Sequence, residues 1–380
     1  MPNIFDEINA LKEEIRDRLS SKLSKKEIRE AVHDPHAHRR PRPCGLTVHT
    51  GIGCPLRCVY CYIYDMGFQH NIRQYPLSPE QLVYALASNP YFIPGRNGTL
   101  IAMGSVTEPF LPQTKDLSIR YIEAITKYLG NPIQFSTKMY IDKRDAWRIA
   151  DIDPDISPLI TIITIKHRVE LEPYAPLPEL RFRTIENLLE AGLKPILFYR
   201  PIIPGIAEEE YEEILVRAKA AGAIGVVAGG LRVTKNILSR LSEKGVPVKE
   251  ILRRMTGPLH DNEQAPVMVS DIKMRIKDKA LSLGFIFFSQ ACMANIYTHG
   301  MYCLRMVVER TVSARFNLPS STEIENIVKK AGLTPIRIRF TRYTLIVRVK
   351  EPCDKVRKFL LQELIKYRYK ICVSIKCEKT

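Results

Sequence analysis

The sequence predicts an α/β fold: a partial, parallel (β/α)6 barrel of the TIM type with an extra segment at each end. Two observations support this. Short apolar runs alternate with amphipathic helical patterns from Cys44 to about residue 290, as in parallel strands joined by helices. Polar or reactive residues directly follow many of these runs, as at the C-terminal ends of barrel strands, where such barrels gather their chemistry. These residues should therefore share one face.

The expected elements follow in chain order, with residues 1–43 as a helical extension and linker and residues 44–305 as the barrel. Ser24 and Glu27 form a capping-box pattern within the helical stretch 4–32. Residues 33–41 hold three histidines among prolines and charges, which we interpret as a solvated linker rather than a metal site. Strands are expected at 46–49, 100–104, 132–136, 159–165, 195–200, 224–228 and 285–289. Helices are expected from residue 78 onward and at 117–129, 143–150, 180–191, 208–221 and 271–283.

Residues 306–380 change character and predict a small basic α+β domain. Its expected elements are helices at 321–331 and 354–366, a hairpin of 336–340 with 345–349, and a strand at 369–375. Residues 320–380 hold 15 Lys and Arg against 6 Asp and Glu, over half of the chain's +16 net charge. Such a module is the usual electrostatic footprint of nucleic-acid binding. A solvated, Lys-rich surface is the alternative.

Two clusters in this domain, Arg342-Tyr343 and residues 367–370, combine aromatic and basic side chains. Such pairs suit base stacking and phosphate contact. They could equally be strand residues half buried at the surface of the domain.

The composition excludes several classes of protein. The longest apolar stretch, 159–165, has the length of a strand and is interrupted by threonines, so we expect no membrane insertion. Asn3, Asp6 and Glu7 stand where a signal peptide would carry basic and then apolar residues. Nine cysteines in 380 residues are too sparse for a secreted disulfide scaffold, and we expect a cytoplasmic protein.

Three cysteines, Cys54, Cys58 and Cys61, stand at spacings of four and three on the loop after the first expected strand. Thiolates this close can converge on one soft metal centre. A closed zinc site needs four ligands. A [4Fe-4S] cluster takes one cysteine per iron, so three cysteines leave one iron open to another ligand. We therefore favour a cluster with an open iron over zinc.

Five motifs, in chain order, match one known family. The first is Cys54-x3-Cys58-x2-Cys61 with Tyr60 before the last cysteine. The others are Met-Gly-Ser-Val-Thr-Glu-Pro-Phe at 103–110, Ser-Thr-Lys at 136–138, Glu-Pro-Tyr-Ala-Pro at 172–176 with Arg181, and Pro-Ile-Ile-Pro-Gly at 201–205. The first is similar to the signature of the radical S-adenosylmethionine (SAM) superfamily. Together they resemble its spore photoproduct lyase-like group, also labelled DNA repair photolyases, over about residues 44–233.

The resemblance implies two cofactors, a [4Fe-4S] cluster and SAM, and an electron donor of the ferredoxin or flavodoxin type. In the family, one electron from the cluster cleaves a carbon–sulfur bond of SAM, and the resulting 5′-deoxyadenosyl radical abstracts hydrogen from an unactivated carbon. Cys54, Cys58 and Cys61 would be the metal ligands. The cofactor-binding residues would be Tyr60, Thr107, Glu108, Ser136, Thr137, Lys138, Glu172, Arg181 and Arg200.

The resemblance also implies individual roles. Tyr60 would lie by the adenine, Glu108 by the amino group of SAM, and Lys138 by its carboxylate. Glu172 and Arg181 would contact the ribose or only pair with each other.

Ser105 departs from the family pattern. Spore photoproduct lyases keep a cysteine at this position that donates a hydrogen atom, and a serine O–H is a far poorer donor, so the lyase reaction does not carry over. Cys292, just after the last expected strand, is the candidate catalytic thiol that would replace it in the lumen. Cys292 and Cys303 could instead bind a second cluster, for which two cysteines do not suffice without Cys44, or be inert core residues.

The sequence thus predicts a radical SAM enzyme acting on a nucleic acid, by DNA lesion repair or RNA modification, with phosphates held by the C-terminal domain. One alternative is a radical SAM enzyme acting on a small molecule, a lipid or a peptide. The other is a non-catalytic metal–thiolate protein that binds nucleic acid.

Overall fold

A seven-stranded parallel sheet is the centre of the computed structural model, which describes residues 4–42, 44–352 and 354–378. The strand order is β1-β4-β5-β6-β7-β8-β11, and every neighbouring pair is parallel. The strands are β1 (Gly45–Val48), β4 (Leu100–Met103), β5 (Ile133–Thr137), β6 (Ser157–Thr161), β7 (Ile196–Ile202), β8 (Gly225–Gly230) and β11 (Ile286–Phe288). Because β1 and β11 are unpaired edges of the described sheet, the barrel is open, and the predicted fold class is confirmed. The seven strands correspond to the seven expected ranges, one more than the (β/α)6 description counts.

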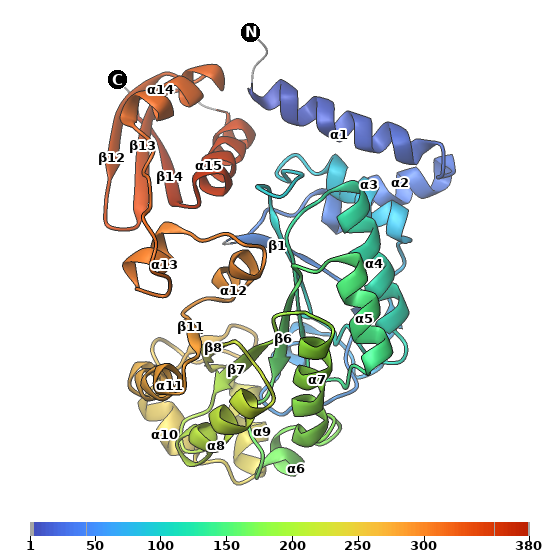
Figure 1. Ribbon diagram of the computed structural model, residues 1–380, viewed down its shortest axis with the longest axis vertical. Helices are drawn as coiled ribbons and strands as arrows, with labels where there is room; N and C mark the ends of the chain where they lie inside the picture. The colour runs from blue at the N-terminus through green and yellow to red at the C-terminus, as the bar shows by residue number, and fades with distance from the viewer. Residues whose placement is uncertain (1–3, 43, 353, 379–380) are drawn as a thin grey trace.

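Helices cover the outer face of this sheet (Figure 1). They are α3 (Pro79–Ser88), α4 (Lys115–Tyr128), α5 (Lys143–Ile152), α7 (Pro178–Glu190), α8 (Ala207–Ala220) and α11 (Ser270–Ser282), each close to its expected range. At α3 the Ser78 side chain accepts from the Gln81 amide at 3.2 Å and the Gln81 side chain accepts from the Ser78 amide at 2.9 Å. This is the capping box that the sequence indicated.

Four helices in the barrel region were not predicted. They are α6 (Arg168–Leu171), α9 (Lys235–Glu243), α10 (Val248–Arg253) and α12 (Ala291–Thr298). Two short antiparallel pairs, β2 (Gly51–Ile52) with β3 (Arg73–Gln74) and β9 (Arg232–Val233) with β10 (Ala265–Pro266), border the same region.

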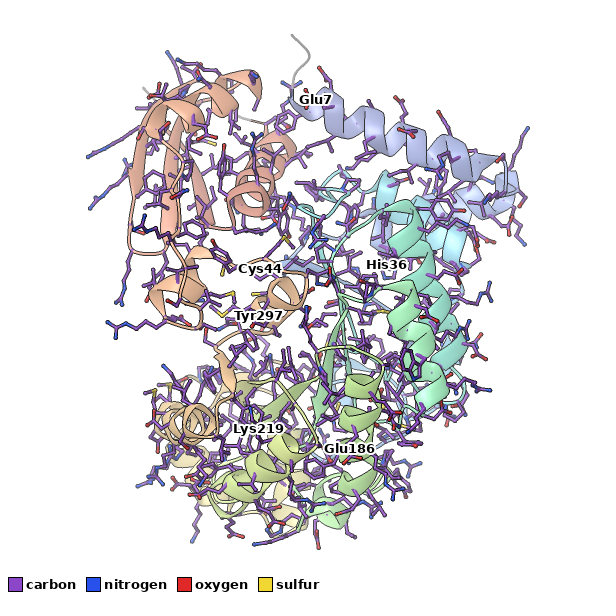
Figure 2. The ribbon with its side chains drawn as sticks, viewed as in Figure 1. Glu7, His36, Cys44, Glu186, Lys219 and Tyr297 are labelled. Carbon is purple, nitrogen blue, oxygen red and sulfur yellow. The ribbon has the colours of Figure 1, made fainter. Side chains whose placement is uncertain are left out.

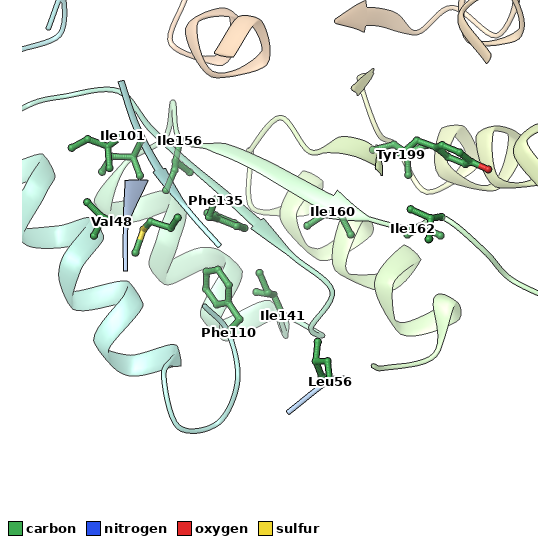
Figure 3. Close-up of a cluster of buried hydrophobic side chains, with 14 of the residues drawn as sticks. Val48, Leu56, Ile101, Phe110, Phe135, Ile141, Ile156, Ile160, Ile162 and Tyr199 are labelled. Carbon is green, nitrogen blue, oxygen red and sulfur yellow. The ribbon is translucent and has the colours of Figure 1, made fainter. Parts of the chain in front are cut away.

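The core lies between the sheet and its helices, as Figure 3 shows for Val48, Ile101, Phe135 and Ile160. All four are buried, and the ring of Phe135 packs against that of Phe110 with centroids 4.7 Å apart. Each such side chain contributes about 1.5–3 kcal/mol of transfer free energy. This packing holds the strand ends, and the loops that follow them, in fixed positions.

The N-terminal segment forms α1 (Ile4–Ser20) and α2 (Lys25–His33), and the expected capping box of Ser24 and Glu27 is present. The solvated-linker interpretation is wrong for His36, which is fully buried beside the Asp34 carboxylate at 2.6 Å. The His36 ring also accepts from the His49 amide at 3.3 Å, which ties this segment to the end of β1. Among the described residues, no set of three potential ligands surrounds one metal-ion position.

The C-terminal module, residues 304–378, has a three-stranded sheet in the order β12-β13-β14 (Figure 1). Its elements are α13 (Leu304–Val308), α14 (Ser321–Lys330), β12 (Pro335–Phe340), β13 (Thr344–Lys350), α15 (Lys355–Tyr369) and β14 (Cys372–Glu378). The helix α15 and the strand β14 pack together, and α14 packs on β12. None of the helices of the described residues is both long enough and apolar enough to span a bilayer.

Candidate active site

The cysteine loop begins just after β2 and holds Cys54, Cys58 and Cys61. The Cys54 amide donates to the Gln69 carbonyl at 3.2 Å, and the Cys61 amide donates to the Cys58 carbonyl at 3.0 Å. Gly53 precedes the first cysteine with φ +91, and a Cβ there would lie 2.3 Å from the Asn71 carbonyl oxygen. Only glycine fits this turn without displacing the neighbouring backbone.

Arg240 lies on α9, a helix that was not predicted, and its side chain holds the cysteine loop in place. Its guanidinium donates to the Val59 carbonyl at 3.0 Å and to the Cys61 carbonyl at 2.9 Å. It also binds the Asp65 carboxylate at 3.0 Å, which in turn accepts from the Thr234 hydroxyl at 2.6 Å. Arg240 was not among the predicted site residues. Two signals could have indicated its helix: Thr234, which caps α9, and the helical spacing of the apolar residues that follow it.

The three thiols are shielded from water. Burial raises the pKa of Cys54 to about 11 and also raises the pKa of Cys58 and Cys61. All three are reduced and unpaired with one another. Thiolates are the form that binds metal, so loading this site must release protons and offset the cost of burial.

The loop fits a [4Fe-4S] cluster better than a single ion. Among the described residues, no three His, Cys, Asp or Glu side chains are placed to surround one metal ion. A tetrahedral zinc site needs four converging ligands, whereas a cubane binds each cysteine to a different iron and so requires the thiols to stand apart. Cys54, Cys58 and Cys61 would hold such a cluster.

A buried charged network lies behind the loop. Tyr60 donates to one Glu172 oxygen, and Arg181 binds the other at 2.5 Å. The Glu172 and Arg181 side chains are fully buried. Burial alone would raise the pKa of Glu172, but Arg181 and then Lys138 hold it below its usual range. Of the two expected alternatives, contact with the ribose or pairing with each other, Glu172 and Arg181 form the pair. Neither residue lines the lumen.

Lys138 joins this network to the lumen. Its ammonium lies 3.9 Å from Glu172 and 5.7 Å from the centre of the Tyr60 ring. Burial disfavours its charge, but Cys58 and Glu172 outweigh that effect and raise the pKa of Lys138. The side chain therefore stays cationic beside the cluster loop.

Glu108 is held on the other side of Lys138. Its carboxylate accepts from the Thr137 hydroxyl and from the backbone amides of Lys138, at 3.0 Å, and Phe110, at 3.3 Å. Burial raises its pKa despite these bonds. Glu108 does not line the lumen. The nearby Thr107 hydroxyl is buried without a hydrogen-bond partner in the part of the chain that the structure describes.

The lumen is a cavity of about 1240 Å³, counting the part open to solvent, at the C-terminal ends of the strands. Tyr60, Cys61, Ser136, Lys138 and Arg200 line it together. The structure therefore brings some of the residues predicted to share one face into the lumen, whereas Thr107, Glu108 and Thr137 do not line it.

Arg200 and Arg232 add two further cations to the lumen wall. The Arg200 side chain crosses Gly229, where a Cβ would lie 2.7 Å from its Cδ atom. The lumen is thus suited to an anionic ligand.

Cys292 is not in the lumen. It lies on α12 and lines a separate cavity with Cys44 and Cys303, whereas its neighbour Ala291 lines the lumen. The prediction of a thiol in the lumen at this position is wrong. The strand β11 ends at Phe288, and Cys292 lies on the next helix, α12, on the side that faces the separate cavity. Ser105 does line the lumen, and Cys61 is the one cysteine among the described lining residues.

The profile of the radical SAM superfamily matches residues 48–218, which contain the cysteine loop and the strand ends around the lumen. This part of the chain is a radical SAM domain. The cofactors of this superfamily are a [4Fe-4S] cluster and SAM.

The radical SAM chain is 28% identical over 169 residues to the uncharacterized protein MJ0683 of Methanocaldococcus jannaschii. That match covers 42% of this chain and 61% of the relative.

Two solved structures of spore photoproduct lyase mutants share the fold. One has a TM-score of 0.52 at 17% identity, covering 64% of this chain and 75% of the lyase. The other, with a bound dinucleoside spore photoproduct, has a TM-score of 0.53 at 16% identity, covering 69% and 82%. The spore photoproduct lyase-like assignment made from the motifs thus agrees with the fold.

Proposed function

We propose that this radical SAM enzyme modifies or repairs a nucleic acid. The observation that carries the proposal is a row of cations on the C-terminal module. Arg337 of β12 pairs in register with Arg348 of β13, which pairs with Lys376 of β14. Residues directly opposite across strands project on the same face, so three positive charges stand side by side.

This row is unfavourable without an anionic partner. Like charges on directly opposed strand positions destabilise a sheet. Arg348 has a carboxylate partner, Glu378 at 2.6 Å, and Arg337 and Lys376 are exposed. A sugar–phosphate backbone laid across the three strands would offset all three charges.

The two aromatic–basic clusters differ in what they offer. Arg305 and Arg342 lie 5.5 and 5.1 Å from the centre of the Tyr343 ring, and Arg342 is exposed, which suits stacking and phosphate contact. In the second cluster Tyr367 is buried and Lys370 lines the cavity of Cys292, whereas the exposed Arg368 lies 5.6 Å from the centre of the Tyr369 ring.

The lumen supports the same class of substrate. Lys138, Arg200 and Arg232 place three cations in a cavity that opens to solvent. A nucleotide flipped from its strand would bring phosphates to this wall, since enzymes that act on bases extrude them into such pockets. A structure of the same fold, a spore photoproduct lyase mutant, holds a dinucleoside spore photoproduct, which is a nucleic-acid fragment.

The roles of the chain's own residues follow from their positions. Cys54, Cys58 and Cys61 hold the cluster, and Arg240 fixes the loop that carries them. Lys138 orients the carboxylate of SAM, while Glu172 and Arg181 position Lys138 and Tyr60. When bound, the cluster and SAM supply one-electron chemistry that removes a hydrogen atom from an unactivated carbon. The electron comes from a ferredoxin or flavodoxin-like donor in the cytoplasm.

Ser105 sets this reaction apart from that of the lyase. Its carbonyl accepts from the Tyr62 hydroxyl at 2.9 Å, and its own hydroxyl is a poor hydrogen-atom donor. The proposal is therefore a nucleic-acid reaction that needs no thiol donor at this position.

The test of nucleic-acid binding is gel retardation of tRNA and of duplex DNA by the full chain across a salt series. The variant Arg337→Gln/Lys376→Gln should weaken binding and reduce the salt slope by about 1 for each lost phosphate contact. Lys329→Gln/Lys330→Gln, on the exposed side of α14, removes the same charge from the same module and is the matched control. Equal binding by both variants would rule out the cation row as the contact surface.

The test of catalysis is anaerobic incubation with SAM, dithionite and deuterium-labelled nucleic acid. Release of 5′-deoxyadenosine is expected, with label transferred to it from the substrate. Protein that holds only zinc and releases none would exclude the radical mechanism.

A further inference from the structure

Four cysteines from distant parts of the sequence line one cavity outside the lumen. Cys44 precedes β1, Cys292 lies on α12, Cys303 caps α13 and Cys372 begins β14. The cavity measures about 800 Å³, counting the part open to solvent. Figure 2 shows Cys44 at the border between the large sheet and the C-terminal module.

The four thiols are near one another. Cys44 and Cys292 line the same wall close enough to perturb each other, and Cys303 and Cys372 lie within electrostatic range of both. All four are reduced, and Cys44, Cys292 and Cys303 are partly buried, while Cys372 stands at the exposed rim. A group of four thiols is unusual for residues that serve only in packing, since the chain brings them together from sites up to 328 positions apart.

The walls of the cavity suit a negatively charged cluster. Arg305, Lys366 and Lys370 line it, with Arg305 also paired to Glu309 and Lys366 to Glu363. Four thiolates carry more negative charge than a cluster core can neutralise, so cations near the ligands are favourable. The rest of the wall is largely apolar, with Leu100 and Ile371 among its residues. An apolar shell with a few cations controls the access of water to a metal centre.

We propose that Cys44, Cys292, Cys303 and Cys372 bind a second [4Fe-4S] cluster, distinct from the one on the cysteine loop. Four ligands match the four irons, so this cluster has no open iron. A zinc ion is disfavoured because no three of these side chains surround a single-ion position within the described residues. A disulfide would use only two of the four thiols that line the cavity.

This assignment resolves the alternatives for Cys292 that the sequence left open. Two cysteines were too few for a cluster, and Cys44 and Cys372 complete the set. It does not depend on the substrate proposed above, because it rests on a different cavity.

The first test needs no variant. After anaerobic reconstitution with iron and sulfide, the wild-type chain should hold about eight iron atoms rather than about four. Mössbauer spectroscopy should show two cluster populations, and addition of SAM should perturb only one of them. A content of about four irons in fully reconstituted protein would overturn the proposal.

The second test separates the two sites with reciprocal variants. Cys54→Ala/Cys58→Ala/Cys61→Ala should keep about four irons and a cluster absorbance that is insensitive to SAM. Cys292→Ala/Cys303→Ala should also keep about four, now sensitive to SAM. Each variant is the control for the other, and thermal unfolding followed by circular dichroism checks that both are folded.

Three results would overturn the proposal. The first is that the Cys54→Ala/Cys58→Ala/Cys61→Ala variant folds but binds no iron. The second is that the second site binds zinc instead of iron. The third is that a Cys44–Cys292 disulfide forms and persists during reconstitution. A single Cys303→Ser variant, which keeps the size of the side chain, serves if the double variant does not fold. It should lower the iron content of the second site and leave the SAM-sensitive spectrum unchanged.

Discussion

Replacing Arg240 by Met should loosen the cysteine loop and so release the cluster. Arg240 donates to the Val59 and Cys61 carbonyls and pairs with Asp65, whose side chain is 3% exposed. Leaving a buried carboxylate without its cation costs about 3–5 kcal/mol. The Thr234 hydroxyl, at 2.6 Å, still binds Asp65, so we take the lower end, about 3 kcal/mol.

The cost should appear mainly as local opening, because Arg240 joins the loop to α9 and does not enter the sheet. Since each 1.4 kcal/mol is tenfold, 3 kcal/mol raises the population of the open loop about a hundredfold. The assay is the rate at which a chelator removes iron from the reconstituted protein, and this rate should rise about a hundredfold in Arg240→Met.

The control for this experiment is Arg253→Met. Arg253 lies on the neighbouring helix α10 with a side chain 75% exposed, in a surface pair with Glu250. Exposed pairs are worth about 0–1 kcal/mol, so its chelation rate should stay near that of the wild type. Equal rates for Arg240→Met and Arg253→Met would refute the role assigned to Arg240.

Three further predictions concern the charged groups of the fold. Arg181→Met should lower the free energy of unfolding by about 3–5 kcal/mol in urea titrations, because it strands the buried Glu172 carboxylate. A loss below about 1 kcal/mol would contradict this, and adding Glu172→Gln should restore part of it. Lys138→Met should weaken SAM binding about 10–100-fold in equilibrium dialysis, the loss of one charge-assisted hydrogen bond, with iron content unchanged. An unchanged affinity would remove Lys138 from the SAM site. Burial, together with Arg39, lowers the pKa of His49 to about 3 in the folded chain. Below pH 6.5 the His49 ring therefore binds a proton in the unfolded chain but stays neutral in the folded chain, which favours unfolding. Stability should therefore fall by about 1–2 kcal/mol between pH 6.5 and pH 5, and by less in His49→Gln; parallel pH profiles would argue against this.

The large-scale fold could be predicted because its signals are local. The parallel strands alternate with helices whose ends carry capping residues, and the predicted bounds mostly fall within two or three residues of those observed. The helices α9 and α12 were missed because they are short, at nine and eight residues, and begin within three residues of the end of a strand. His36 was misjudged for a related reason: its burial depends on Asp34 and on β1, not on the polarity of its own segment.

The site could be predicted only in part, for a physical reason. Motifs identified which residues follow strand ends, so Lys138, Ser136 and Arg200 share the lumen as expected. Motifs do not fix rotamers, and Glu108 turns instead to Thr137 and to backbone amides. The group around Cys292 could not be recognised, because it forms between segments that meet only once the C-terminal module packs on the barrel.

The helix α12 is a wall shared by two cavities, and this changes how mutations on it should be interpreted. Ala291 faces the lumen, where its carbonyl accepts from Gln134 at 2.9 Å, while the next residue, Cys292, faces the thiol cavity. A substitution on the side of α12 that faces one cavity therefore also moves the wall of the other cavity. Loss of activity in a Cys292 variant could therefore come from a change in the shape of the lumen as well as from loss of the thiol. Only a measurement of metal content separates these two effects.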